Sequence, residues 1–325
     1  MDKELHEKFI EIAKEKISDK ANFASVLADL LSIKKEAIYR RLRGEVFFTF
    51  AEMATISKKL DISLDYVAGI VSPYRSYPFS LHVQDYVEQE EIDYKMTADY
   101  IAAIRRAGNL PYSEFGYIAT IIPLHFAVFH EPFYYLYILK WMYQTSKYNP
   151  VPFSEISFNE RQKKLNAQFL QEVMSIKYTY YIWDELFLTY MLNDINYFHS
   201  IHLMTDADML LMKKEIEYFL KRLEKLAIQG AYNNGNKVDI YVSSLNFETT
   251  YYYLFSDIEN ISMISSFSVG AITSLEKSVC ERMKAWVQGL KRTSTLISCS
   301  AEKERIAFFE TQRMTLKTFF DHYEH

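Results

Sequence analysis

A cluster of cations near the N-terminus, directly after a short apolar segment, sets the strongest limit on the fold of this chain. Residues 27–33 read LADLLSI, and the next segment, KKEAIYRRLRGE, holds five Lys and Arg residues within positions 34–43. Residues 1–70 as a whole carry twelve cations and twelve acids, so the positive field belongs to one helix-sized segment. A single basic helix on a neutral module has the charge distribution needed to read one DNA groove.

Apolar residues at helical spacing divide residues 1–70 into five short helices. Asn22 is placed to cap the second helix, and Gly44 stands where a left-handed cap would end the third. Phe50 begins the apolar face of the fourth helix, and Ser63 is placed to cap the fifth. The expected helices cover residues 5–17, 23–31, 34–43, 50–60 and 64–69.

The order and spacing of these segments resemble the lambda-repressor-like, XRE-type helix-turn-helix family. LADLLSI is similar to the family pattern L-A-x-x-L-G-I-S, Arg43-Gly44 to its R-G ending, and SLDYV to its S-L-D-x-L segment. Three residues depart from the pattern: Ser32 replaces the turn glycine, Lys34 the Ser/Thr cap, and Arg41 an apolar side chain. The resemblance covers residues 5–70 and implies a five-helix DNA-binding head of a transcriptional regulator.

The rotation of the third helix assigns roles to its side chains, because successive residues turn by about 100°. With Ile38 and Leu42 turned inward, four side chains face the groove: Glu36, Tyr39, Arg40 and Arg43. Arg commonly pairs with guanine, Glu accepts a hydrogen bond from the cytosine amino group, and Tyr contacts a thymine methyl or a phosphate. Phosphate contacts are expected from the start of the second helix and from the other cations: Asn22, Ser25, Lys34, Lys35 and Arg41.

The rest of the chain predicts a linker and a second domain. VSPYRSYPF indicates a semi-rigid linker over residues 71–80, and residues 81–325 form the larger domain. Periodicity predicts helices over residues 94–107, 129–143, 158–181, 183–199, 206–229, 275–291 and 301–322. Two or three antiparallel strands are predicted in three segments rich in β-branched and aromatic residues: KVDIYVSSLNF, TTYYYLF and ISMISSFSVGAI. A further segment, YIATII, is open to a strand interpretation. We expect a mainly α fold, α+β overall, in which the head is followed by a large helical domain with a small antiparallel sheet near the C-terminus.

Composition limits the class of protein. The chain is 49% apolar and 24% charged, with a formal net charge of -5, as in ordinary globular proteins. The charged opening segment and the interrupted apolar run near residues 117–143 predict neither a secretion signal nor a membrane span. Two cysteines, Cys280 and Cys299, fit a reducing cytoplasm. No Walker loop, GxGxxG, GxSxG, HExxH or paired CxxC motif occurs, so we expect no enzyme activity, cofactor or metal.

Aromatic residues make up 16% of the chain and gather at residues 133–137, 178–183 and 251–255. Core packing is the first interpretation, and a ligand pocket is the alternative. The leading hypothesis is a cytoplasmic transcriptional regulator that binds double-stranded DNA and forms a homodimer through residues 81–325, with a small-molecule or peptide effector. Two alternatives remain: a repressor or antitoxin without an effector, and an interaction adaptor that does not bind DNA.

Overall fold

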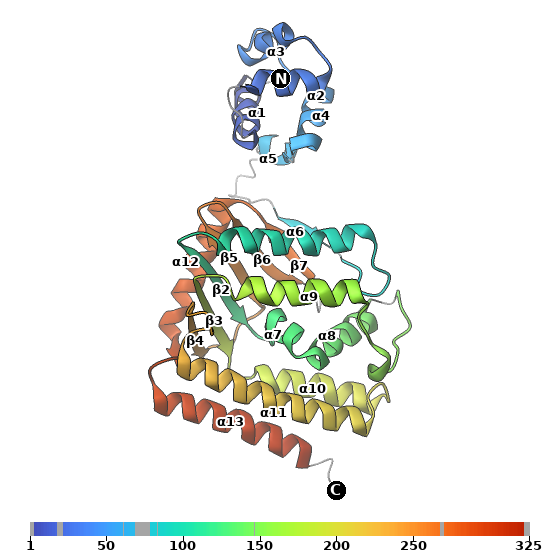
Figure 1. Cartoon of the computed structure of the whole chain (residues 1–325), viewed down its shortest axis with the longest axis vertical. Coiled ribbons are helices and arrows are strands. Elements are labelled where there is room, and N and C mark those ends of the chain that lie inside the picture. The colour runs from blue at the N-terminus through green and yellow to red at the C-terminus, as the bar shows by residue number, and fades with distance from the viewer. Residues whose placement is uncertain are drawn as a thin grey trace. The chain divides into compact units, whose positions relative to one another are not determined.

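The computed structural model describes residues 3–17, 22–60, 62–68, 79–82, 84–145, 147–266 and 270–321. The chain divides into two compact units, residues 1–78 and 79–325 (Figure 1). Most of the predicted linker, residues 71–78, lies outside the described residues. Each unit is described by itself below.

The first unit consists of short helices around one small core. α2 packs against both α3 and α4, and α1 packs against α4 and α5. Their apolar stripes meet at Phe9, Leu27, Ile38 and Ile56, each at most 1% exposed. Phe50, predicted on the apolar face of the fourth helix, is instead 78% exposed, because the buried stripe of that helix begins one turn later at Met53. The described helices are α1 (Lys3–Lys16), α2 (Phe23–Leu31), α3 (Lys35–Leu42), α4 (Phe50–Leu60) and α5 (Leu64–Ala68).

The second unit is built on a mixed sheet. Within its described residues the strand order is β1-β7-β6-β5-β2-β3-β4-β8. The adjacent strands β2, β3 and β4 pair in parallel, and the other neighbours pair antiparallel. The strands are β1 (Ser80–His82), β2 (Ser113–Ala119), β3 (Tyr178–Asp184), β4 (Lys237–Ser243), β5 (Tyr251–Ser256), β6 (Asn260–Ser266), β7 (Gly270–Ser274) and β8 (Ser294–Leu296).

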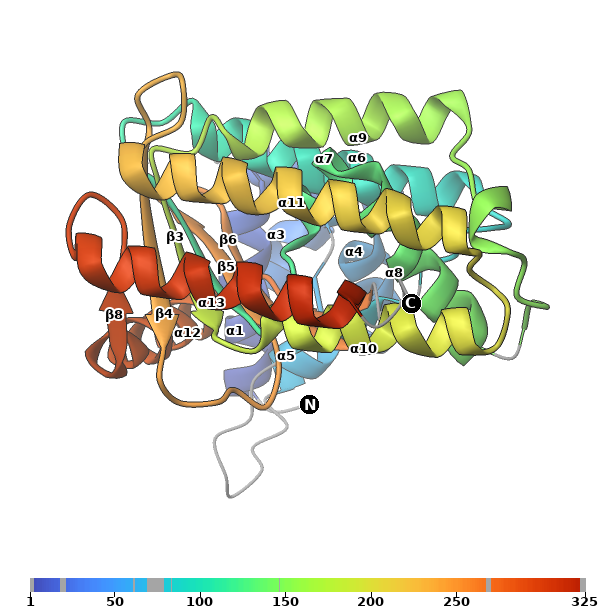
Figure 2. The same ribbon diagram turned by 90° about the horizontal axis from the view of Figure 1, so that it is seen from below.

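Helices cover the two faces of this sheet unequally. α12 lies on one face, and the other long helices of the unit lie on the opposite face (Figure 1). α11 and α13 run side by side along their length (Figure 2). The helices are α6 (Glu91–Gly108), α7 (Leu124–Phe129), α8 (Glu131–Gln144), α9 (Glu160–Val173), α10 (Phe187–Ser200), α11 (Asp206–Gln229), α12 (Lys277–Leu290) and α13 (Glu302–Asp321), with short 3-10 turns η2 (Phe153–Glu155) and η3 (Lys291–Thr293).

The fold is α+β, but the prediction of a small antiparallel sheet was wrong. Residues 178–181, predicted as the end of a helix over residues 158–181, belong to β3, the middle one of the three parallel strands, and α9 ends at Val173. The next helix begins at Phe187, since Trp183 also belongs to β3. Both faces of β3 are covered, so its residues from Thr179 to Asp184 are all buried, without the alternation that marks a half-exposed strand.

The three aromatic clusters pack in the core, as the first interpretation predicted. Tyr180, Tyr181, Trp183 and Tyr253 are fully buried, and Phe133 is buried on the helical side. Tyr117 and Tyr252 stack across β2 and β5 with ring centroids 4.9 Å apart. These rings fill the space between the sheet and its helices.

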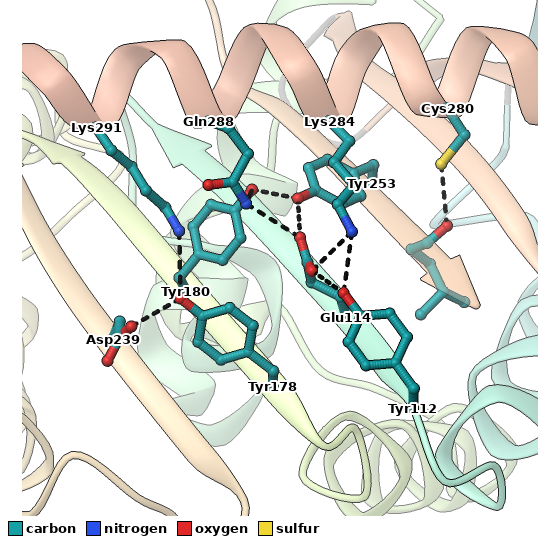
Figure 3. Close-up of polar contacts among 11 residues, drawn as sticks. Tyr112, Glu114, Tyr178, Tyr180, Asp239, Tyr253, Cys280, Lys284, Gln288 and Lys291 are labelled. Carbon is teal, nitrogen blue, oxygen red and sulfur yellow. Dashed lines mark hydrogen bonds and ion pairs between the residues drawn. The ribbon is translucent and has the colours of Figure 1, made fainter.

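A polar layer joins α12 to the sheet (Figure 3). Glu114 on β2 is 3% exposed, and it accepts hydrogen bonds from Lys284 at 2.8 Å and from the hydroxyls of Tyr112 and Tyr253. Gln288 Nε2 donates to the second carboxylate oxygen at 3.3 Å. Burial acts to raise the pKa of Glu114, but these hydrogen bonds hold it below the usual range. The carboxylate is therefore charged and well satisfied at neutral pH.

Candidate nucleic-acid interface

The turn between α2 and α3 depends on a serine in the left-handed backbone region. Ser32 ends α2 with φ 54°, and the N–H of Ile33 donates to Ala28 O at 3.1 Å. Lys34 then adopts an extended conformation, and its carbonyl accepts the first hydrogen bonds of α3. Ser32 thus performs the reversal for which glycine is better suited, because a side chain disfavours this backbone conformation.

α3 turns one apolar stripe inward and a charged face outward. Ile38 is fully buried against α2, and Leu42 is half-buried beside it. The residues predicted to face the groove are all exposed: Glu36, Tyr39, Arg40 and Arg43. Lys34 and Lys35, at the start of the helix, are exposed as well. The helix therefore presents four cations on a surface that a polyanion can reach.

Arg41 does not belong to this surface, in contrast to its predicted phosphate contact. Its guanidinium group forms a two-pronged ion pair with Glu52 of α4, at 2.6 and 3.1 Å, and also donates to Ala37 O. The side chains of Arg41 and Glu52 are only 15% and 18% exposed. Glu52 also accepts from the N–H of Thr49, which completes a cap at the start of α4. Arg41 therefore joins α3 to α4, which explains a cation at a position expected to be apolar.

Glu45 contacts both outward-facing arginines. Arg43 Nε donates to Glu45 Oε1 at 2.6 Å, and Arg40 Nε lies 3.5 Å from the other carboxylate oxygen. The hydrogen bond from Arg43 holds the pKa of Glu45 below its usual range. This contact was missed in the sequence, although Gly44 marked the bend: with φ +74°, Gly44 turns the chain so that Glu45 lies beside the helix it follows.

The two phosphate contacts predicted on α2 lie at its first turn. Asn22 is the exposed N-cap residue, but its side chain makes no cap hydrogen bond to the helix. Ser25 is half-buried in the first turn. Both are thus near the end of a helix whose backbone N–H groups favour an anion.

Comparison of the chain with protein-family models, curated proteins and solved structures finds no match. Across the described residues, no helix is both long and apolar enough to cross a membrane. In the same part of the chain, no three His, Cys, Asp or Glu residues lie together in a way that would hold a metal ion.

Proposed function

We propose that this protein is a sequence-specific DNA-binding transcriptional regulator with a lambda-repressor-like head. The observation that carries the proposal is the exposed face of α3, the helix that follows the α2–α3 turn, with Arg40 in its last turn and Arg43 at its C-cap both exposed. A helix of this length fits the major groove, and its outward arginines suit guanine edges.

In this proposal the other predicted contact residues divide into two groups. Glu36 and Tyr39 face the bases together with the arginines, because the four side chains share one side of α3. Lys34, Lys35, Asn22 and Ser25 contact phosphates and orient the head on the duplex. Arg41 is excluded from both groups, since its guanidinium group is engaged by Glu52.

Glu45 acts on DNA binding as an internal competitor. Its carboxylate occupies the same two guanidinium groups that the proposal assigns to DNA. DNA must displace these contacts with Glu45 before it can bind the two arginines. A single phosphate contact offsets this cost less well than a bidentate contact with the right base, so nonspecific binding is weakened more than specific binding. The head therefore has a built-in bias toward specific sites.

We further propose that the protein acts in the cytoplasm as a homodimer through its second unit. One head reads only a few base pairs, whereas two heads on a twofold axis read half-sites about 34 Å apart. Molecular mass measured by light scattering tests this directly, and a monomer at micromolar concentration would contradict it.

Selection of bound sequences from a random duplex pool, at near-physiological salt, tests the DNA-binding proposal. We expect a palindromic motif. Arg40→Ala and Arg43→Ala should each weaken binding to that motif by about tenfold or more, because each removes a base contact. Lys58→Ala, an exposed cation on α4, is the control and should change binding little. Recovery of no motif would instead favour a role in protein contacts.

Glu45→Gln provides a test in the opposite direction. We expect it to tighten DNA binding roughly two- to tenfold at low salt, because it releases two arginines and removes a like charge from the DNA-facing surface. Glu11→Gln, which removes an exposed carboxylate from α1, is the matched control. Unchanged binding for both variants would mean that α3 does not face DNA.

A further inference from the structure

The second unit contains a cavity of about 360 Å³ beside α7, α9 and α11. α7 lies between the other two helices in both views (Figures 1 and 2). The wall is mostly apolar, with Phe126, Val173, Phe219 and Leu226 among its members. A cavity of this size and character is typical of sites for small organic molecules and is too small for a folded peptide.

The polar groups deep in the cavity are uncharged. His125 is 6% exposed, and its Nε2 lies 2.7 Å from the hydroxyl of Tyr181, which in turn lies 2.7 Å from the hydroxyl of Tyr232. Burial lowers the pKa of His125 to about 3, so its imidazole is neutral at physiological pH. This end of the cavity therefore offers hydrogen bonds without a charge.

The lining is buried at His125 and exposed at Arg222 and Lys225, so its two cations lie where the cavity opens to solvent, at its mouth. The guanidinium group of Arg222 lies 3.6 Å from the ring centroid of Phe129 and 5.7 Å from that of Tyr218. Stacking uses the face of a guanidinium group and leaves its in-plane N–H donors available. Within the described residues, Arg222 donates no hydrogen bond to a carboxylate or carbonyl group. Lys225 adds a second cation to the lining.

No acid neutralises these cations from within the cavity wall. None of the described lining residues is Asp or Glu. The nearby carboxylate of Glu215 accepts from His130 Nδ1 at 2.5 Å, and the His130 ring is buried against Phe133. A guanidinium group held by aromatic rings, without an internal counterion, is suited to pair with an anion from solution.

We propose that this cavity binds a small carboxylic acid with an aromatic or similarly apolar body. The body lies among the apolar side chains, and the carboxylate pairs with Arg222 at the mouth. A carboxylate is favoured because its two oxygens match the parallel N–H donors of a guanidinium group. Any regulatory consequence of this binding rests on the proposed function, whereas the binding itself needs no DNA.

Titration of the full-length protein with 3-phenylpropionate, followed by ligand-observed NMR and calorimetry in the absence of DNA, tests the proposal. The uncharged comparison probe is 3-phenylpropanol. A fragment of this size should saturate the site at roughly 10 mM or below. We expect the acid to bind about tenfold more tightly than the alcohol, because only the acid pairs with Arg222.

Two variants locate the binding. Arg222→Gln should abolish the preference for the acid while binding of the alcohol is retained, and Leu226→Phe should weaken both probes by filling the cavity. Arg292→Gln, an exposed arginine outside the cavity lining, is the matched control. Absence of saturable binding by the acid, or an acid preference that survives Arg222→Gln, would overturn the proposal. Because DNA is absent, neither result bears on the function of α3.

Discussion

Replacement of Glu114 by Gln should destabilise the second unit through the polar layer beneath α12. The substitution retains the shape of the side chain and removes the negative charge that Lys284 pairs with at 2.8 Å. It also replaces one acceptor oxygen with an NH₂ group, which meets donors from Tyr112 or Tyr253. The first change leaves the ammonium group of Lys284 without its counterion, and the second places a donor opposite a tyrosine hydroxyl that now donates to the carboxylate.

The exposure of the pair determines the size of the effect. Breaking a fully buried ion pair costs about 3–5 kcal/mol, because the remaining charge has no compensation. The Glu114 side chain is 4% exposed, but that of Lys284 is 23% exposed, so water can partly solvate the ammonium group. We therefore expect the free energy of unfolding to fall by about 2–4 kcal/mol. The matched control is Glu172→Gln, whose partner Arg105 is 52% exposed, and it should have a much smaller effect.

Tryptophan fluorescence during urea denaturation is the appropriate assay. Trp141, Trp183 and Trp286 are the only tryptophans, and all three lie in the second unit, so the signal reports its unfolding alone. The double variant Glu114→Gln/Lys284→Met should lose less stability than the sum of the two single variants, because the two residues interact. Equal small effects for Glu114→Gln and Glu172→Gln would refute this account of the layer.

The same variant should alter the acid dependence of stability. The pKa of Glu114 is lower in the folded protein than its ordinary value. The contribution of its carboxylate to stability is therefore complete above the ordinary pKa of a carboxylate, and it is lost as the pH falls from there through the pKa of the folded state. The stability of Glu114→Gln should therefore fall less steeply below about pH 5 than that of the unaltered protein. Identical slopes would show that the carboxylate has no special environment.

Three further substitutions test other features. Gly116→Ala would bring a Cβ within 2.5 Å of the ring of Tyr253 and 2.6 Å of the hydroxyl of Tyr180. The free energy of unfolding, measured by tryptophan fluorescence, should therefore fall by about 2–4 kcal/mol. Ser32→Gly should stabilise the head by about 0.5–1 kcal/mol, because glycine adopts the left-handed conformation of residue 32 without a side-chain penalty. Amide exchange in α2 and α3 measures this, and a loss of protection would contradict the left-handed turn. His6 is buried, and among the described residues neither of its ring nitrogens has a hydrogen-bond partner. Burial lowers its pKa, so protection of α1 should be complete above the ordinary histidine pKa and decline as the pH falls below it. His6→Leu should remove this decline.

Local sequence patterns were sufficient for most helices. The helix predicted over residues 206–229 has those bounds, because its apolar spacing, its polar start and Gly230 at its end all lie within one segment. Thr205, and not Asp206, accepts the capping hydrogen bond, which is a shift of one residue. The five helices of the head were likewise predicted in order, since each carries its own periodicity and turn signals.

The strands and the parallel pairing required tertiary structure. β3 is buried on both faces because several helices cover one side and α12 covers the other. A short, largely apolar segment of this kind has the same appearance in a buried helix. Its neighbours β2 and β4 lie about sixty residues away on either side, so no local pattern specifies the pairing.

The candidate sites divide in the same way. The outward face of α3 follows from helical rotation, and its exposed residues were identified from the sequence alone. The partners of the arginines did not follow from it: Arg41 pairs with Glu52 eleven residues away, and Glu45 reaches α3 only through the bend at Gly44. The cavity is lined from α7, α9 and α11, which are separated in sequence. Periodicity and caps are properties of a few adjacent residues, whereas the counterion of a side chain and the walls of a cavity depend on which distant segments pack together.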